Sequence, residues 1–490
     1  MDSARRLLPL CVDLDGTLIR TDLLHESCLL LARQKPWMLI LLPFWLMKGK
    51  AHLKRRIAEN VTINAASLPF RADFLAWLRT QASEGVQLTL VTASDKLLAE
   101  PVAACVGIFC EVLATDGALN LAGGNKARVL VERYGERGFD YAGNSRVDLQ
   151  VWSHAREAIV VNGSTVLIES VRTAAPVSAS FARTPLRLKT LLKAIRVRQW
   201  VKNALVFVPL LTSFRLLNAS AFEADVLAFL SFSFCASSVY LLNDLLDLES
   251  DRLHPKKKNR PFASGALPIA YGVVMAPILL LAGFLVAMLL PREALGLLVV
   301  YYVLTFAYSF YLKRKMLVDV FTLSGLYTIR VLMGGAASGI LCSPWLIAFS
   351  MFIFLSLAFS KRCSELFQLK KRETDSAAGR SYFVWDQFTM NVFGIASAYV
   401  SAIVLGLYIY SPEIRGHYLH PNWLWLLVLL LLYWLSRVWI LAGRGAMDED
   451  PIVFATTDRV TYASVAITVA LLYLAARGPF GVLGMQELAK

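Results

Sequence analysis

The sequence predicts two domains of different fold class: an N-terminal α/β domain over residues 1–170 and a C-terminal all-α bundle of about nine membrane helices over residues 191–490. With 490 residues, the chain is long enough for more than one domain. Its composition is 57% hydrophobic and only 18% charged, so part of it should lie in lipid. The long apolar runs begin only after residues 171–190, which are rich in Ala, Ser, Pro and Thr and predict a linker.

The first domain alternates short β-rich runs with helical patterns. LPLCVDLD, VQLTLVTAS and EAIVVNGS predict strands, whereas FRADFLAWLRTQASEG and KARVLVERYGER predict helices. This alternation is typical of parallel strands joined by crossover helices, as in a Rossmann-like sheet. The N-terminus has a short apolar run that is broken by Pro9 and followed by acids, so we do not expect a signal peptide.

One segment of the first domain, residues 36–56, is unusually apolar and then basic. Its apolar part is about a dozen residues, which is too short to span a membrane. We favour a buried helix of a cap insert. The alternative is an interfacial helix whose Trp and Phe lie among lipid headgroups. Its bases would then contact anionic lipid: Lys48, Lys50, Lys54, Arg55 and Arg56.

Nine apolar runs in the second domain predict membrane spans near residues 203–218, 223–243, 268–290, 294–311, 317–340, 344–360, 389–411, 422–441 and 459–477. The loops richest in Lys and Arg all fall on one side, which should be the cytoplasmic side. We therefore expect a multi-pass protein of the inner (plasma) membrane, with the α/β domain and the active-site face in the cytoplasm. The sequence is compatible with a homo-oligomer.

The net charge of +14 suits nucleic acid, lipid headgroups or phosphorylated substrates. The bases lie between apolar spans rather than on one soluble face, so we exclude nucleic acid as a partner. The seven Cys form no CxxC pair, and we expect unpaired thiols.

The stretch LLNDLLDLESDRLHPKKKNRPFASG, residues 241–265, combines clustered acids with clustered bases. At about 100° per helical residue, one face carries Asn243, Asp244, Asp247 and Asp251. Acids this close repel unless a cation lies among them, and oxygen ligands suit Mg²⁺, which takes substrate phosphates as further ligands. We predict that these four bind Mg²⁺ and a diphosphate, with Asp247 and Asp251 catalytic. The alternative is a solvated helix end paired with Lys256–Lys258.

The bases downstream can neutralise phosphate oxygens that the metal does not reach. We assign this role to His254, Lys256, Lys257, Lys258 and Arg260. Attraction to the membrane surface is the alternative.

The motif NDLLDLESD resembles the NDxxDxxxD motif of the UbiA superfamily of intramembrane transferases, which implies a nine-helix bundle with a cytoplasm-facing pocket. Within it, the chain is most similar to the decaprenyl-phosphate phosphoribosyltransferase family. The similarity lies in four stretches: residues 196–211, 241–265, 308–339 and 360–382. It implies Mg²⁺-dependent transfer of 5-phosphoribose from 5-phosphoribosyl 1-diphosphate to polyprenyl (decaprenyl) phosphate, with release of pyrophosphate.

A second motif separates this reaction from aromatic prenyl transfer. Aromatic prenyltransferases of the superfamily carry a DxxxD motif where this chain reads YSFYLKRKMLVD, with a single acid, Asp319. A basic site suits a lipid monophosphate, so we assign Lys313 and Tyr308 to that phosphate. Further candidates for phosphate binding are Lys202, Lys361, Arg362 and the mid-span Arg330. A prenyltransferase using a prenyl diphosphate is the alternative, and a transporter or scaffold is a third interpretation.

In the first domain, VDLDGTL ends a predicted strand with two acids two residues apart. One acid can attack phosphorus while the other protonates the leaving group, with Mg²⁺ screening both. The domain resembles the haloacid dehalogenase (HAD) phosphatases. That resemblance assigns Asp13 as nucleophile, Asp15 as acid/base, Thr92 and Lys126 to the phosphate, and Asp13, Asp15 and Asp148 to the metal.

The segment GNSRVD departs from the family pattern GDSxxD, because Asn144 stands where an acid is expected. The Mg²⁺ affinity should fall, and a degenerate domain is the alternative to an active phosphatase. If active, the domain would remove the 5-phosphate of the neighbouring domain's product.

Overall fold

The computed structural model describes residues 8–182, 185–213, 218–371, 381–415, 418–447 and 451–477. It comprises two compact units. The first contains Met1–Arg196 and Tyr240–Pro277, and the second contains Val197–Val239 and Ile278–Lys490. The α/β domain therefore shares a unit with the acidic motif and the loop after it.

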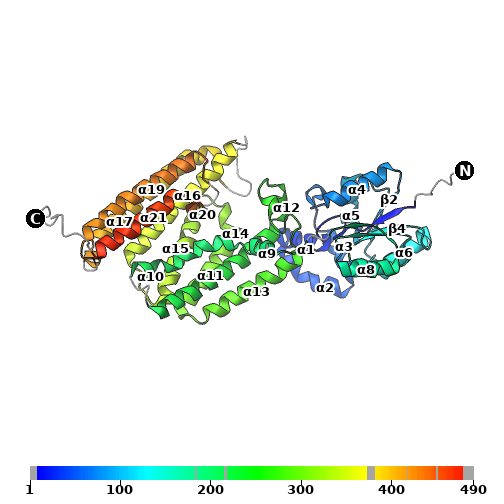
Figure 1. Cartoon of the computed structure of the whole chain (residues 1–490), viewed down its shortest axis with the longest axis horizontal. Helices are drawn as coiled ribbons and strands as arrows, with labels where there is room; N and C mark the ends of the chain where they lie inside the picture. Colours follow the sequence, from blue (N-terminus) through cyan, green and yellow to red (C-terminus); the bar gives the residue numbers. More distant parts are fainter. Residues whose placement is uncertain are drawn as a thin grey trace, which may run out of the picture. The chain divides into compact units, whose positions relative to one another are not determined.

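The α/β domain contains a parallel sheet with helices packed around it (Figure 1). Its six strands lie in the order β3-β2-β1-β4-β5-β6. The strands are β1 Leu10–Val12, β2 Leu88–Asp95, β3 Glu111–Thr115, β4 Asp140–Gly143, β5 Ala158–Val161 and β6 Val177–Phe181. The order reverses between β1 and β4, and the carboxyl ends of strands at such a point flank a crevice. The predicted runs correspond to β1, β2 and β5.

Helices cover both faces of this sheet because successive strand residues point to opposite sides. Leu10 and Val12 lie in one core and Cys11 in the other. The first core includes residues of α1 Leu23–Gln34, α3 Lys50–Ala58, α4 Ala72–Ser83 and α5 Lys96–Val106. The second includes residues of α6 Gly124–Tyr134, α7 Leu149–Trp152 and α8 Thr165–Ala174.

A helical insert between β1 and α4 forms the expected cap. It consists of α1, η1 Pro36–Leu41, α2 Leu42–Met47 and α3, followed by η2 Ala65–Ser67. The favoured interpretation of residues 36–56 as a buried helix is wrong for η1 and α2, which contain no buried residue. The apolar run is broken into two short helical pieces, each starting near a proline, and only part of it reaches the core.

The structure also differs from our expectation for the linker. Residues 171–181 complete α8 and form β6, which pairs with β5 at the edge of the sheet. The short polar run VSASF gives a weak strand signal by itself, and the exposed edge beside β5 makes it a strand. Residues after it form α9 Leu188–Ala194.

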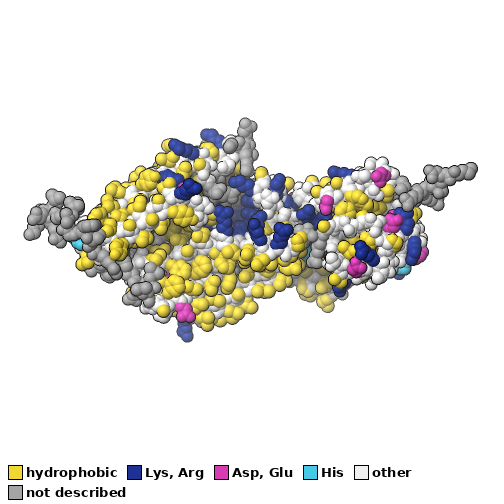
Figure 2. Space-filling view, in the orientation of Figure 1, with side chains coloured by type: hydrophobic (Ala, Val, Ile, Leu, Met, Phe, Trp, Pro, Cys, Tyr) yellow, Lys and Arg dark blue, Asp and Glu magenta, His cyan; other side chains and the backbone are white. Residues whose placement is uncertain are grey.

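Eight helices are long and apolar enough to cross a membrane among the described residues. They include α11 Ala219–Leu246, α13 Ile269–Ala287, α14 Arg292–Phe310, α15 Val318–Ser338, α16 Pro344–Lys371, α17 Gln387–Tyr410, α19 Trp425–Gly443 and α21 Arg459–Arg477. Figure 2 shows hydrophobic side chains over the outer surface of α13, as a lipid-facing helix requires. Shorter elements complete the unit: η6 Leu312–Arg314, η7 Val384–Asp386, α18 Pro412–Arg415, η8 Pro421–Leu424 and α20 Pro451–Ala455.

The first predicted span, residues 203–218, is not a continuous helix over its described residues. It consists of the end of η4 Val197–Phe207 and of α10 Val208–Thr212, with Pro209 at the start of α10. Proline interrupts the helix because it lacks an amide proton. This segment packs very closely on α15: a Cβ on Gly334 would lie 1.7 Å from the carbonyl oxygen of Val206. Glycine at position 334 therefore permits the close approach of these two segments.

Candidate functional site

Asp13 follows β1 at the crevice of the sheet and is held by two donors. Lys126 Nζ donates to its Oδ1 at 2.7 Å, and Thr17 Oγ1 donates to its Oδ2 at 3.0 Å. Burial raises the pKa of Asp13, while the charge of Lys126 opposes this shift. Burial by itself would lower the pKa of Lys126, but Asp13 and then Asp148 outweigh it and raise that pKa. The predicted nucleophile and lysine therefore form a buried ion pair.

Asp15 lies beside the end of β2. Its Oδ2 accepts hydrogen bonds from Ser94 Oγ at 2.7 Å and Thr92 Oγ1 at 3.2 Å, and its Oδ1 accepts one from the Leu23 amide at 2.8 Å. Burial, followed by the charges of Asp22 and Asp13, raises the pKa of Asp15 to about 7. A carboxyl group with this pKa can hold and release a proton near neutral pH, as an acid/base requires.

The loop after β4 is organised by Asp148. Its Oδ2 accepts hydrogen bonds from the Asn144 amide, the Ser145 amide and Ser145 Oγ, and its Oδ1 accepts one from Tyr141 at 2.9 Å. Tyr141 in turn accepts a hydrogen bond from Lys126 at 3.0 Å. All of these contacts fix the loop, and direct metal binding by Asp148 stays a prediction.

Asn144 packs directly over the loop that carries the two acids. A Cβ on Gly16, whose φ is +75°, would lie 2.0 Å from Nδ2 of Asn144, so this turn needs glycine for space as well as for its backbone conformation. Asp13 and Asn144 offer only oxygen atoms as ligands, which suits Mg²⁺. Asn144 supplies one negative charge less than the usual acid.

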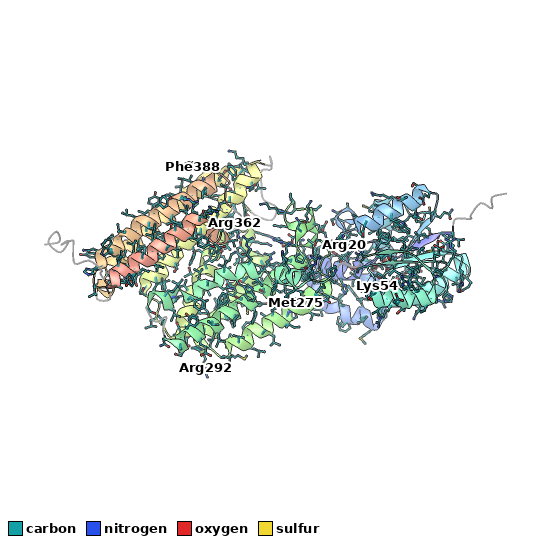
Figure 3. The ribbon with its side chains drawn as sticks, viewed as in Figure 1. Arg20, Lys54, Met275, Arg292, Arg362 and Phe388 are labelled. Atoms are coloured by element: carbon teal, nitrogen blue, oxygen red, sulfur yellow. The ribbon has the colours of Figure 1, made fainter. Side chains whose placement is uncertain are left out.

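Lys54 of the cap is a site residue that sequence reasoning did not assign to the phosphatase chemistry. Its Nζ donates to the Ala93 carbonyl at 2.7 Å and to Asn120 Oδ1 at 2.9 Å (the residue is labelled in Figure 3). Burial lowers the pKa of Lys54, and the charges of Asp15 and Asp22 oppose this decrease. Its only signal in the sequence is the basic run HLKRR, which was considered solely as a contact for anionic lipid in the alternative interpretation of residues 36–56.

The acidic motif centres on a guanidinium group. Arg260 Nη1 donates to Asp244 Oδ1 at 3.0 Å and to Asp251 Oδ2 at 2.6 Å, and Arg196 pairs with the same oxygen of Asp244. Asp244 and Asp251 are only 2% and 3% exposed. Burial raises the pKa of Asp251, and Arg260 opposes that shift. These acids are thus not solvated partners of Lys256–Lys258.

Asp247 has a different environment. It lies at a break between α11 and α12 Leu248–Leu253, with φ −101° and ψ 15°, and its Oδ1 is 3.6 Å from Arg33 Nη2 on α1. A second ion pair joins α12 to α1, because Arg252 Nη1 donates to Glu26 Oε2 at 3.2 Å. The helix was expected to be continuous through the motif, and the break gives Asp247 a partner of its own.

The bases after the motif are mostly at the surface. Lys256 and Lys258 are exposed and Lys257 is half-buried, near η5 Lys257–Asn259. His254 Nδ1 accepts hydrogen bonds from the amides of Lys256 and Lys257, at 3.2 and 3.3 Å, and so caps the turn. Figure 2 shows Lys and Arg gathered around α12.

In the second unit, Arg362 joins three helices. It donates to Asp319 Oδ2 of α15 at 2.7 Å, to Tyr308 of α14 at 2.8 Å and to Glu365 of α16 at 2.5 Å. The position of Arg362 is labelled in Figure 3. Tyr382 donates to the other oxygen of Asp319, which is fully buried. The sequence did not indicate Tyr382 as a partner of Asp319, because the two residues lie far apart along the chain.

Arg330 lies inside the same unit and is 5% exposed. Its Nε donates to Asn203 Oδ1 at 2.9 Å and its Nη2 to Tyr301 at 3.2 Å. The rings of Phe232, Tyr301 and Tyr327 surround it at 5.0–5.8 Å, the range for cation–π contact. Arg330 is therefore enclosed by protein rather than exposed on the outer surface, and its predicted role in phosphate binding stays a prediction. Lys202 is also buried.

Among the described residues, no three Asp, Glu, His or Cys side chains already converge as a metal site. At the acidic motif, the cationic group between Asp244 and Asp251 is the guanidinium of Arg260. The donor set of Asn243, Asp244 and Asp251 is nevertheless all oxygen, so it fits Mg²⁺ chemically. Arg196, the second partner of Asp244, was not predicted as a site residue, and its only signal in the sequence is the basic stretch IRVRQWVK. In the structure its backbone is left-handed, with φ +54°.

Comparison with known proteins identifies both parts of the chain. Residues 206–465 match the UbiA prenyltransferase family, and residues 10–152 match haloacid dehalogenase-like hydrolases. Protein y4nM of Sinorhizobium fredii is 35% identical over 485 residues, covering 97% of this chain and 92% of y4nM.

Two named relatives match a shorter part. Nodulation protein NoeC of Azorhizobium caulinodans is 34% identical, covering 55% of this chain and 87% of NoeC. Decaprenyl-phosphate phosphoribosyltransferase of Mycobacterium tuberculosis is 36% identical, covering 45% of this chain and 74% of that enzyme.

Proposed function

Because this chain belongs to the UbiA prenyltransferase family and carries a HAD-like domain, we propose that it transfers 5-phosphoribose from 5-phosphoribosyl 1-diphosphate to a polyprenyl (decaprenyl) phosphate. The products would be polyprenylphosphoryl-5-phosphoribose and pyrophosphate. The observation that carries this proposal is the arrangement of Asp244 and Asp251 around one cationic group, Arg260. Similarity to the phosphoribosyltransferases supports the choice of substrates.

The donor site would be formed by the acidic motif. Asn243, Asp244, Asp247 and Asp251 would hold Mg²⁺, which stabilises negative charge on a departing pyrophosphate. Arg196 and Arg260 can then bind phosphate oxygens, because guanidinium groups form paired hydrogen bonds with phosphates. Lys256, Lys257 and Lys258 would attract the anionic donor to this side of the membrane.

The acceptor site would be formed in the second unit and needs no metal. Asp319 already binds Arg362 and Tyr382, so it is engaged in two strong contacts rather than presented to a metal. This favours a lipid monophosphate over a prenyl diphosphate. Lys313, Lys361 and Tyr308 would bind that phosphate, whose oxygen is already anionic at neutral pH and attacks the ribose without a strong base. We also propose that both sites face the cytoplasm across an inner (plasma) membrane.

The transferase is tested with radiolabelled 5-phosphoribosyl 1-diphosphate, polyprenyl phosphate and Mg²⁺, followed by lipid extraction. We expect labelled lipid from the wild type and a loss of at least about 100-fold in Asp251→Asn, because a carboxylate ligand is lost. Glu249→Gln, on the same short helix, is the matched control and should keep its activity. Label transfer from a prenyl diphosphate to an aromatic acceptor instead would overturn the proposal.

The HAD domain would remove the 5-phosphate from this product. Asp13 would form a bond to phosphorus while the ribose oxygen leaves with a proton from Asp15, and water would then release phosphate from Asp13. Mg²⁺ would screen the acids from the phosphate. Lys126 neutralises Asp13, and Thr92 lies within hydrogen-bond distance of Asp15.

Release of inorganic phosphate from the complete enzyme, given both substrates, tests this step. We expect Asp13→Asn to stop phosphate release while the labelled lipid still forms and keeps its 5-phosphate. Identical lipid products from wild type and mutant would show that the domain does not act on this product.

A further inference from the structure

The η1–α2 segment, Pro36–Met47, displays large apolar side chains to solvent. The most exposed are Met47 at 84%, Ile40 at 72%, Trp37 at 64% and Phe44 at 60%. They recur every three or four residues, so they line one side of the segment. Figure 2 shows hydrophobic atoms gathered where α2 lies. An apolar surface of this kind on a soluble domain marks a binding surface.

The other side of the segment fastens it to the α/β domain. Met38, Leu42 and Trp45 pack against the core that contains Leu31 and Ile57. The segment is therefore a fixed part of the domain, and its outward side chains are presented on an ordered surface.

Positive charge flanks this apolar surface. Residues 27–58 include seven Lys and Arg and no Asp or Glu. Lys48, Lys50 and Arg56 are exposed, whereas Lys54 and Arg55 turn toward the domain, Arg55 lying 3.2 Å from Asp95. Apolar and aromatic side chains beside exposed bases are the combination that binds anionic lipid headgroups.

We infer that the η1–α2 segment inserts into the headgroup region of an anionic bilayer. Its two pieces have six residues each, which is too short to span a membrane but suits a segment lying in the plane of the interface. A second copy of this basic face would bring like charges together, which disfavours self-association. The membrane spans of the same chain keep a bilayer within reach.

This contact would act on the HAD site through α3. Gly49 has φ 109° and ψ 157°, a conformation that other residues rarely adopt, and it joins α2 to α3. On α3, Lys50 is exposed and Lys54 is directed to the crevice of the sheet. The bilayer would therefore fix the helix that supplies a lysine near Asp15.

Photocrosslinking of the full-length protein in nanodiscs tests the inference. p-Benzoylphenylalanine replaces Phe44 or, as a control, Val166, which is 58% exposed on α8. We expect at least about tenfold more phospholipid adduct at position 44 than at position 166, measured by mass spectrometry. Equal yields at both positions, or adducts at position 44 with a second copy of the chain, would overturn the inference.

The charge requirement has a separate test in the same nanodiscs. Phosphatidylglycerol should raise the adduct yield at position 44 over phosphatidylcholine alone, and Lys48→Gln with Lys50→Gln should reduce that gain by about fivefold or more. Lys96→Gln, at an exposed lysine of α5, should leave it unchanged. A yield that is insensitive to the anionic lipid and to both lysines would show that anionic headgroups are not the partner. Unchanged hydrogen exchange of the β1 amides verifies that the variants are folded.

Discussion

The two acid clusters of the first unit are neutralised in different ways. In the α/β domain, Asp13 is paired with Lys126, whose side chain is only 4% exposed. In the acidic motif, Asp244 is paired with Arg196 and Arg260, which are 23% and 28% exposed. One countercharge is enclosed by the fold, and the other two reach solvent.

This difference separates a fixed site, whose countercharge is part of the folded core, from an adaptable site, whose countercharges can change partners. Replacing the enclosed Lys126 leaves Asp13 without compensation in a buried position, which is costly. The arginines lie on segments flanking the motif and are partly exposed, so the proposed donor would replace a carboxylate partner with a phosphate without disturbing a core. The comparison therefore predicts stability effects in the first cluster and mainly activity effects in the second.

The largest effect is expected for Lys126→Met. Breaking a buried ion pair by removing one partner costs about 3–5 kcal/mol, so the α/β domain should unfold far more readily. Hydrogen exchange of the β1 and β4 amides in the complete protein measures this. Arg260→Met is the matched variant of the other cluster, and equal destabilisation by both would remove the distinction between fixed and adaptable sites.

Arg260→Lys should reduce phosphoribosyl transfer by about 10- to 100-fold while the stability changes little. A lysine keeps the charge, but as a point charge it lacks the planar guanidinium with its five donors, and hydrogen bonds to charged groups contribute about 1.5–3 kcal/mol. The lipid-extraction assay measures the rate. Lys258→Gln, at an exposed base of the same loop, should have a smaller effect.

Asn144→Asp should strengthen the first cluster as a metal site. A further carboxylate beside Asp13 should lower the Mg²⁺ concentration for half-maximal phosphate release by about tenfold, or about 1.4 kcal/mol. Without metal, the added charge should repel Asp13 and Asp15, so the variant should lose stability in chelator. An unchanged Mg²⁺ requirement would indicate that residue 144 does not contribute to a metal site.

The smallest effect is expected in the second unit, for Tyr382→Phe. Its hydrogen bond to the Asp319 carboxylate contributes about 1.5–3 kcal/mol to stability, but its loss should affect substrate binding only indirectly, by loosening Arg362 and Tyr308. We expect the KM for polyprenyl phosphate to rise a few-fold while the KM for 5-phosphoribosyl 1-diphosphate stays constant. Tyr462→Phe, an exposed tyrosine of α21, is the control. A selective change in the donor KM would place this cluster at the other substrate.

The sequence predicted the class of both domains and some of the residues that meet in them. Eight of the nine predicted spans correspond to helices, because apolar length is a property of the local sequence. Asp15, which follows β1, and Thr92, in the second half of β2, meet because parallel strands end at one edge of the sheet. Spacing alone did not show Tyr382 or Arg196 as partners, since each lies far along the chain from the acid that it contacts.

What the sequence determined by itself was which charges had to be accommodated: acids on one helix end, bases after it, and apolar runs long enough for lipid. Only the tertiary structure decided how they are neutralised, because a countercharge is chosen by distance in space rather than along the chain. The tertiary structure also turned the apolar side of Pro36–Met47 outward, since only Met38, Leu42 and Trp45 of this segment pack against the core.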